Sequence, residues 1–255
     1  MNKPYPQENA SGKPSRGDRD WLSAFSWMSA AVFILGLALL AGIHREKNSL
    51  IDELHFTGHH FTGTEELEGS FESPVGLHPD SVRFMDLMDR VSGLPYIKKA
   101  RVRVEAGGKM IVDVQEREPL ALLVDGGNRA YIDKDGIRLP VKPGKSPDVP
   151  LLHGFSAVPL SDTLSGREFE SVRDFLSAAK ENGFGWITIS EVLFDNRQGV
   201  VALSLENGVK LLFGRGGFDR KMDYWEAFYS GVIRQKGIEQ FTSIDLRYQD
   251  QVVTR

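Results

Sequence analysis

The sequence contains no cysteine among its 255 residues. Disulfide bonds, thiolate metal sites and cysteine nucleophiles are therefore excluded, and a domain outside the cytoplasm must take its stability from its core. The chain also lacks a nucleophile elbow or any other catalytic motif, so nothing in the pattern supports an enzyme. The formal net charge of −4 gives no reason to expect nucleic acid or anionic lipid as the main partner.

Charge is absent from one continuous stretch of 22 residues, Leu22–Ile43. At about 1.5 Å per residue, a helix of this length spans roughly 33 Å, which is enough to cross a hydrocarbon core of ~30 Å. The stretch therefore predicts a transmembrane signal anchor. A cleaved signal peptide is the alternative, but about 20 mostly polar residues precede the stretch and no small-x-small site follows it.

The segments beside the predicted anchor indicate its orientation. Residues 1–21 carry four cations, whereas only Arg45 and Lys47 follow the anchor closely. This difference favours a cytoplasmic N-terminus and an extracytoplasmic C-terminal domain. Residues 1–21 also contain three prolines and too little apolar surface to offset the entropy of ordering, so we expect a disordered tail.

The pattern over residues 50–118 predicts a small α+β unit with helices on one face of a sheet. Alternating apolar residues indicate strands, and apolar residues at helical spacing after Pro79 indicate a helix that Gly93 ends. The expected elements are a strand over 51–56, a helix from Thr64, a helix over 79–91, and a hairpin of strands 100–104 and 110–114.

Residues 119–255 predict a mostly antiparallel β domain with two packed helices. A capping box at Ser165 begins the first expected helix, and Asp219 caps the second. Asn207-Gly208 is a strong two-residue hairpin signal. The expected strands cover 120–124, 129–133, 186–194, 201–205, 209–213 and 243–248, the last continuing to 252–253. The fold class expected for the whole chain is thus α+β with a single N-terminal transmembrane helix.

Four features could suggest chemistry, but each has a better structural explanation. The three histidines of residues 55–60 would not converge on one metal ion, and residues 133–136 lack the later ligands of a calcium loop. Gly214–Gly217 precedes a helix without the Lys-Ser/Thr pair of a phosphate loop. Glu116 and Glu118 lie at a strand end, where a solvated or ion-paired surface is the default. We therefore expect no metal and no cofactor.

Two segments carry a resemblance to a known family. They are Leu94–Arg103, with sequence LPYIKKARVR, and Ile111–Ala121, with sequence IVDVQEREPLA. They resemble the Pro-x-Val-x-x-Ala-x-Val strand and the Glu-Arg-x-Pro-x-Ala boundary of the FtsQ/DivIB family of bacterial cell-division proteins. Weaker similarities occur in the same order at Ile132–Gly136, Leu151–Gly154, Leu205–Gly208 and Ile244–Tyr248. Ala106–Gly108 departs from the Trp-Pro type of turn that many members have.

The resemblance extends from about Leu22 to the end and implies a domain organisation. A disordered cytoplasmic tail (1–21) would precede the anchor (22–43), a POTRA domain (50–118) and a C-terminal β domain (119–255). It also implies a non-enzymatic scaffold of the divisome, which recruits FtsB and FtsL at the division septum. Such a protein would be a single-pass protein of the inner (cytoplasmic) membrane, with its C-terminal domain in the periplasm.

The resemblance places partner binding on the last strands of the β domain. An edge strand presents unpaired N–H and C=O groups, to which a partner segment can add as a further strand. The implied contacts are Tyr248, Asp250, Gln251 and Val252, with Arg197 matching less closely a basic residue implicated in the family. For Tyr248, a role in merely covering the sheet is an equally weighted alternative.

Other classes of function remain open at this point. Another anchored POTRA protein, such as a secretion component or a periplasmic chaperone, could use the same edge. Depletion distinguishes them, because a divisome scaffold should give filaments without septa and a chaperone should give envelope stress with normal division. An anchored envelope hydrolase is disfavoured by the missing catalytic motif.

Arg101 and Arg103, on an exposed strand face of residues 50–118, would form a second interaction surface.

Overall fold

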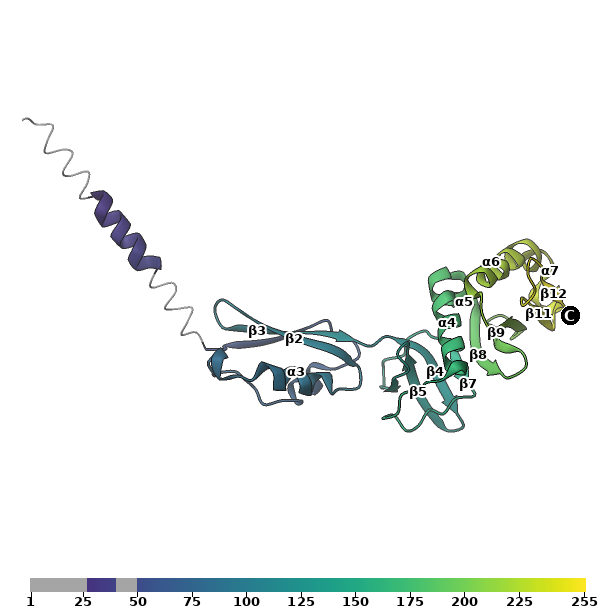
Figure 1. The fold of residues 1–255 in the computed structure, drawn as a ribbon, viewed down its shortest axis with the longest axis horizontal. Coiled ribbons are helices and arrows are strands. Elements are labelled where there is room, and N and C mark those ends of the chain that lie inside the picture. Colours follow the sequence, from purple (N-terminus) through teal and green to yellow (C-terminus); the bar gives the residue numbers. More distant parts are fainter. Residues whose placement is uncertain (1–26, 40–49) are drawn as a thin grey trace, which may run out of the picture. The chain divides into compact units, whose positions relative to one another are not determined.

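The computed structural model describes residues 27–39 and 50–255 (Figure 1). Residues 27–39 form a helix whose apolar side chains are exposed, with Trp27 at 78% exposure. Within the described ranges, no helix is both long enough and apolar enough to cross a membrane. The predicted anchor 22–43 extends beyond the described helix on both sides, and the predicted tail lies outside the described residues.

The part of the chain after residue 50 begins with a three-stranded sheet of order β1-β3-β2. The order strand–helix–helix–strand–strand along the chain confirms the pattern expected for this region. The predicted helix over 79–91 is wrong in its first half, because Val82 is extended and separates a short 3-10 turn from the true helix. The elements are β1 (Glu53–Thr57), α2 (Thr64–Glu68), η1 (Pro79–Ser81), α3 (Phe84–Ser92), β2 (Ile97–Glu105) and β3 (Lys109–Glu116).

The remainder of the chain forms a nine-stranded sheet of order β12-β11-β10-β9-β8-β7-β4-β5-β6. The sheet is mostly antiparallel, as predicted, and its parallel neighbours are β10 with β11, β4 with β7, and β7 with β8. The strands are β4 (Pro119–Asp125), β5 (Asn128–Asp133), β6 (Arg138–Pro140), β7 (Leu151–His153), β8 (Ile189–Asp195), β9 (Gly199–Ser204), β10 (Lys210–Gly214), β11 (Ser243–Asp245) and β12 (Val253–Thr254).

Helices pack against this sheet and enclose its core. Phe175 of helix 167–182 contacts Phe213 of β10, with ring centroids 4.7 Å apart. It also contacts Phe218 of helix 218–228, with ring centroids 5.5 Å apart. Trp225 is fully buried, and its indole N–H donates to Thr188 Oγ1 at 2.8 Å. The helical elements are α4 (Arg167–Asn182), α5 (Phe184–Thr188), α6 (Phe218–Phe228), the π-helical η2 (Tyr229–Ile233), α7 (Arg234–Lys236) and η3 (Ile238–Gln240).

Three local predictions in this region are wrong. No side-chain cap forms at α4, because the residue before it is Gly166 at φ 106, a conformation that disfavours side chains. The N-cap of α6 is Gly217, in the left-handed region, and Asp219 lies inside the first turn. Trp186 belongs to α5 rather than to a strand, and β8 begins only at Ile189.

The chain divides into two compact units. One comprises Met1–His55, Pro74–Val82 and Arg103–Ile111, and the other comprises Phe56–Ser73, Arg83–Val102 and Val112–Arg255. The second unit contains the whole nine-stranded sheet and its helices. The predicted domain boundary at 118/119 stays a prediction.

Candidate functional site

The last strands of the chain lie at one end of the nine-stranded sheet. β11 runs parallel to β10, and β12 returns antiparallel to β11 as the terminal strand of the sheet. The expectation that the C-terminal strand is a sheet edge is therefore confirmed. The predicted continuous strand 243–248 is wrong, because β11 ends at Asp245. The Asp245 carboxylate accepts the backbone N–H of Arg247 at 3.1 Å, and this Asx turn takes the chain out of the strand.

The register of β12 decides which of its backbone groups point outward. Ser243 and Arg255 exchange two hydrogen bonds, with N···O distances of 3.2 and 3.0 Å, and Asp245 is paired with Val253. In an antiparallel ladder, hydrogen-bonded and non-hydrogen-bonded pairs alternate. The N–H and C=O groups of Val253 therefore face β11, whereas those of Val252 and Thr254 face away from it.

Residues 246–252 form a turn that is held in shape by Arg247. The guanidinium of Arg247 donates to both carboxylate oxygens of Asp245, at 2.8 and 2.5 Å. Burial alone would raise the pKa of Asp245, but these bonds and the backbone N–H of Arg247 lower it overall. The stem of Arg247 lies over Gly214, where a Cβ atom would be only 3.2 Å from Arg247 Cγ. A side chain at position 214 would therefore displace Arg247.

The predicted contact residues occupy different environments within this turn. Tyr248 is 52% exposed and lines a hollow of about 400 Å³ beside Tyr224. Asp250 adopts a φ of 57° and accepts a 2.6 Å hydrogen bond from the Tyr224 hydroxyl. This bond is the main cause of the raised pKa of Tyr224. Gln251 is exposed, and Val252 is half-buried against the core. Asp250 thus shapes the turn, while Tyr248 and Gln251 are accessible.

Arg197 comes from the neighbouring β8–β9 turn. The Asp195 carboxylate accepts the backbone N–H groups of Arg197 and Gln198 at 2.8 and 2.7 Å, which lowers the pKa of Asp195 and leaves the Arg197 side chain exposed. Gly199, which follows this turn, packs closely on Gly214: a Cβ on Gly199 would be 2.4 Å from the Gly214 carbonyl carbon. Gly214, at the end of β10, thus lies close both to the turn that carries Arg197 and to Arg247.

Lys221 is a residue of this site that the sequence did not single out. Its Nζ donates to the backbone carbonyls of Phe213 and Gly216, both at 2.6 Å. Burial lowers the pKa of Lys221. Residues 213–216 thus direct carbonyl oxygens towards a cation. A phosphate loop would instead direct backbone N–H groups towards an anion. The available signal was a lysine in the first turn of the predicted helix, close after the glycine-rich segment.

Glu116 also differs from its predicted role as a surface carboxylate. Its Oε2 accepts the backbone N–H groups of His60 and Phe61 at 2.6 and 2.8 Å, and its Oε1 accepts that of Thr62 at 2.7 Å. Burial would raise the pKa of Glu116, but these N–H groups lower it overall. Glu118, by contrast, forms an exposed ion pair with Lys180, as the surface interpretation expects.

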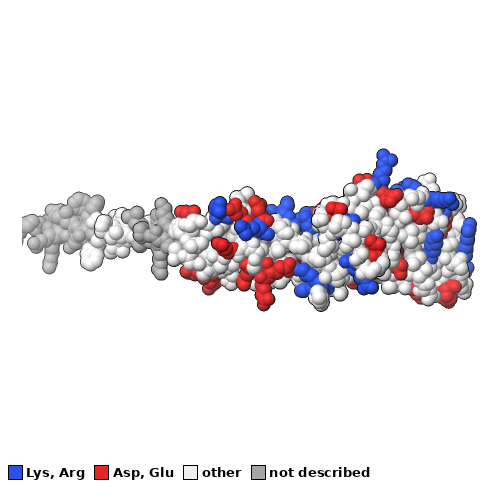
Figure 2. Space-filling view, turned by 90° about the horizontal axis from the view of Figure 1, so that it is seen from below, with Lys and Arg blue, Asp and Glu red and all other residues white. Residues whose placement is uncertain are grey.

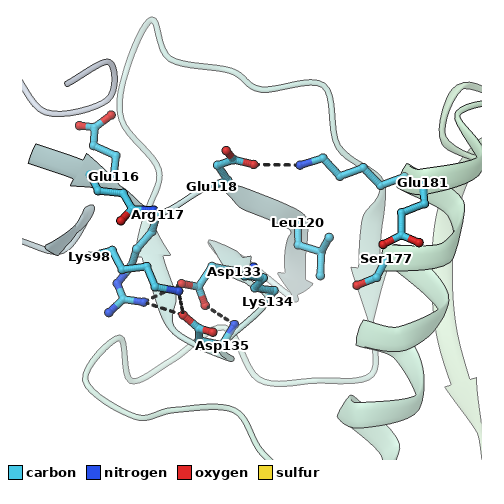
Figure 3. A pocket seen from close by; sticks show the side chains of 12 residues that line it. Lys98, Glu116, Arg117, Glu118, Leu120, Asp133, Lys134, Asp135, Ser177 and Glu181 are labelled. Atoms are coloured by element: carbon cyan, nitrogen blue, oxygen red, sulfur yellow. Dashed lines mark hydrogen bonds and ion pairs between the residues drawn. The ribbon is translucent and has the colours of Figure 1, made fainter. Parts of the chain in front are cut away.

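Residues 133–136 form a hairpin turn, and Asp133, Lys134 and Asp135 line a hollow of about 430 Å³ (Figure 3). Asp133 accepts the N–H groups of Asp135 and Ile137, and its other oxygen accepts from Arg117 at 2.8 Å. Asp135 pairs with Lys98 at 2.6 Å, and this bond is the main cause of its lowered pKa. The charges of these two aspartates are thus balanced by Arg117 and Lys98. Within the described ranges, no cluster of histidines and carboxylates could hold a metal ion.

Arg101 and Arg103 both lie exposed on β2, as predicted. Arg103 forms an ion pair with Glu105 at 3.4 Å. Burial alternates along β2, so Lys99, Arg101, Arg103 and Glu105 share one exposed face of the strand.

Comparisons with known proteins agree on one family. The model of a family described as FtsQ/DivIB, C-terminal related, matches residues 118–255. A cell division protein FtsQ from Salinibacter ruber is 28% identical over 234 residues, covering 89% of each chain. Another FtsQ, from Rhodothermus marinus, is 30% identical over 177 residues, covering 66% of this chain and 64% of the relative.

A solved structure also matches in part. It is the major extracytoplasmic domain of the bacterial cell division protein DivIB from Geobacillus stearothermophilus, at 17% identity and a TM-score of 0.32. The match covers 47% of this chain and 97% of that one. At this score, the family assignment is carried by the sequence matches.

Proposed function

The chain belongs to the FtsQ/DivIB family of cell division proteins, and from this premise we propose that it is a non-enzymatic, membrane-anchored scaffold of the divisome. In this proposal, residues 22–43 anchor the chain in the inner membrane with the N-terminus in the cytoplasm. The POTRA domain (50–118) and the β domain (119–255) act outside the cytoplasm, at the septum. Their partners are FtsB- and FtsL-type division proteins.

The observation that carries the binding mechanism is the outer edge of β12. Within the described residues, no further strand lies beyond β12. Its register directs the backbone groups of Val252 and Thr254 away from the sheet, and these groups can pair with an incoming extended segment. Strand addition at this edge would give backbone hydrogen bonds, while neighbouring side chains would select the partner.

The side chains around this edge favour a partner segment that carries carboxylates. Arg197, Arg215 and Arg220 are exposed near the turn that precedes β12. Figure 2 shows Lys and Arg side chains, along with some Asp and Glu side chains, at the end of the molecule that holds the C-terminal strands. Asp245 is already paired with Arg247. Arg220 lines the hollow beside the turn together with Asp219, and it would pair with a carboxylate of the incoming segment.

The proposed mechanism is tested by proline substitutions chosen by register. Val252→Pro and Thr254→Pro each remove an N–H group that points away from β11, so the free protein should stay folded while partner binding is lost. Thr254→Ala keeps the N–H group and should bind normally. Tyr248→Ala tests the adjoining side-chain contact and should also lose binding with the fold intact.

The readout is co-purification of the FtsB–FtsL pair with the full chain, with circular dichroism as the control for folding. Unchanged co-purification with Val252→Pro and Thr254→Pro would overturn strand addition. Loss of binding with Thr254→Ala as well would show that the side chain, rather than the backbone edge, makes the contact.

A further inference from the structure

Three segments of the first compact unit meet at one end of it. The N–H of Ile51 donates to the carbonyl of Leu77 at 2.9 Å, and the N–H of Gly76 donates to the carbonyl of Ile51 at 2.8 Å. On the other side, the N–H of Asp52 donates to the carbonyl of Gly108 in the β2–β3 turn at 2.8 Å. Figure 1 shows this turn at the end of the unit where the chain enters at residue 50. The three segments form one connected tip.

Three large aliphatic side chains are exposed on this tip, beside the exposed Asp52. Leu50, Val75 and Leu77 are 47, 48 and 48% exposed, and they come from segments that the hydrogen bonds above hold together. Ala106 and Gly107 in the adjoining turn are also exposed and add no charge. Turns at the surface normally carry polar residues, and single exposed aliphatic residues are common. Three exposed aliphatic side chains on segments that hydrogen-bond to one another indicate a surface that meets an apolar partner.

The covalent structure of the chain identifies that partner. Only six residues, 44–49, join Leu50 to the end of the apolar stretch Leu22–Ile43. A chain of this length reaches at most about 25 Å when it is fully extended. The tip therefore lies within that distance of the end of the proposed anchor, and the bilayer surface is the large apolar phase within reach. The tip has no cluster of cations, so apolar insertion rather than attraction to anionic headgroups would hold it there.

We infer that the tip formed by Leu50, Val75 and Leu77 inserts into the boundary between the lipid headgroups and the acyl chains. The inference rests on the proposed membrane anchor at residues 22–43. It makes the first unit a second point of membrane attachment, which would fix the orientation of the unit to the bilayer.

The absence of cysteine makes this inference directly testable. A single Val75→Cys substitution in the full chain accepts one environment-sensitive fluorophore, and the protein is then reconstituted into phosphatidylcholine vesicles that carry a quencher near the top of the acyl chain. The label at position 75 should show blue-shifted emission and strong quenching. The same label introduced through Leu205→Cys, at a residue that is 66% exposed, should show neither.

A second variant tests whether the apolar surface is the cause. Adding Leu77→Asp to the protein labelled at position 75 should reduce the quenching, whereas adding Leu205→Asp, the same change at an exposed residue outside the tip, should leave it unchanged. Circular dichroism checks that each variant is folded.

Two results would overturn the inference, and they are distinguishable. Protein that floats with the vesicles but shows no more quenching at position 75 than at position 205 contradicts the tip alone. Protein that does not float with the vesicles contradicts the proposed anchor as well.

Discussion

The three backbone hydrogen bonds to Glu116 give a prediction whose magnitude follows from the structure. Glu116→Gln keeps one carbonyl acceptor but turns an NH₂ group towards backbone N–H groups that the second carboxylate oxygen had accepted. Hydrogen bonds to a charged group contribute about 1.5–3 kcal/mol each. Because the carboxylate is only partly buried and one acceptor remains, we expect a loss of about 2 kcal/mol in the free energy of unfolding at pH 7.

The same bonds predict how this loss depends on pH. The pKa of Glu116 in the folded protein is below its ordinary value of 4.5, so its stabilisation is complete above about pH 4.5 and is lost as the pH falls through the folded-state pKa. The difference between wild type and Glu116→Gln should therefore shrink at acidic pH.

The assay is urea unfolding of the full chain in detergent, followed by far-UV circular dichroism at pH 7 and near pH 3. Glu118→Gln is the matched control, because its exposed ion pair with Lys180 is expected to contribute less than about 1 kcal/mol. The reasoning is refuted if Glu116→Gln costs no more than Glu118→Gln, or if its cost is the same at both pH values.

Two further predictions concern Gly58, which follows β1, and the turn of residues 246–252. Gly58→Ala should lower the free energy of unfolding by about 3 kcal/mol in the same assay. The reason is that φ is 81° at Gly58 and the new Cβ would lie 2.1 Å from the carbonyl oxygen of Val114. A loss below about 1 kcal/mol would contradict this. Tyr224→Phe removes the hydrogen bond to Asp250 and should weaken FtsB–FtsL binding by about 3- to 10-fold in a titration. The reason is that the turn of residues 246–252 must then be ordered on binding. Unchanged affinity would show that this bond does not order the turn in the free protein.

Local patterns predicted the elements that local physics determines. Alternation located the β2–β3 hairpin and most strands of the large sheet, but it missed β6 and β7, which have three residues each. Asn207 and Gly208 do turn the chain, with φ values of 58° and 59°. The predicted two-residue loop is wrong, however, because the N–H of Ser204 donates to the carbonyl of Val209 and Leu203 pairs with Lys210, which makes a four-residue loop over 205–208. These features depend on neighbouring residues alone, so a single sequence contains the information for them.

The errors arose where tertiary contacts decide the conformation. The apolar run after Trp186 resembles a strand, but its first residues form α5, in which Thr188 Oγ1 donates to the carbonyl of Phe184 and accepts the indole N–H of Trp225. Trp225 lies 37 residues further along the chain, so no local pattern contains this contact.

The candidate site was predictable in position but not in internal structure. An edge near the C-terminus followed from the pattern of strands, and the accessible Tyr248 lies in the expected region. The role of Asp250 in shaping the turn depends on Tyr224, 26 residues away. The early end of β11 had a local signal, because Asp245 can accept the backbone N–H of Arg247 and form an Asx turn. The alternation of residues 243–248 nevertheless led to the prediction of a longer strand.

Strand addition at β12 is tested most directly by hydrogen exchange of individual backbone amides in the full chain, with and without the FtsB–FtsL pair. The amides of Val252 and Thr254 face away from β11, so they should exchange rapidly in the free protein and become strongly protected in the complex. The amide of Val253, which faces β11, should change much less. Full binding of the partner with no added protection at residues 252 and 254 would contradict the proposed mechanism.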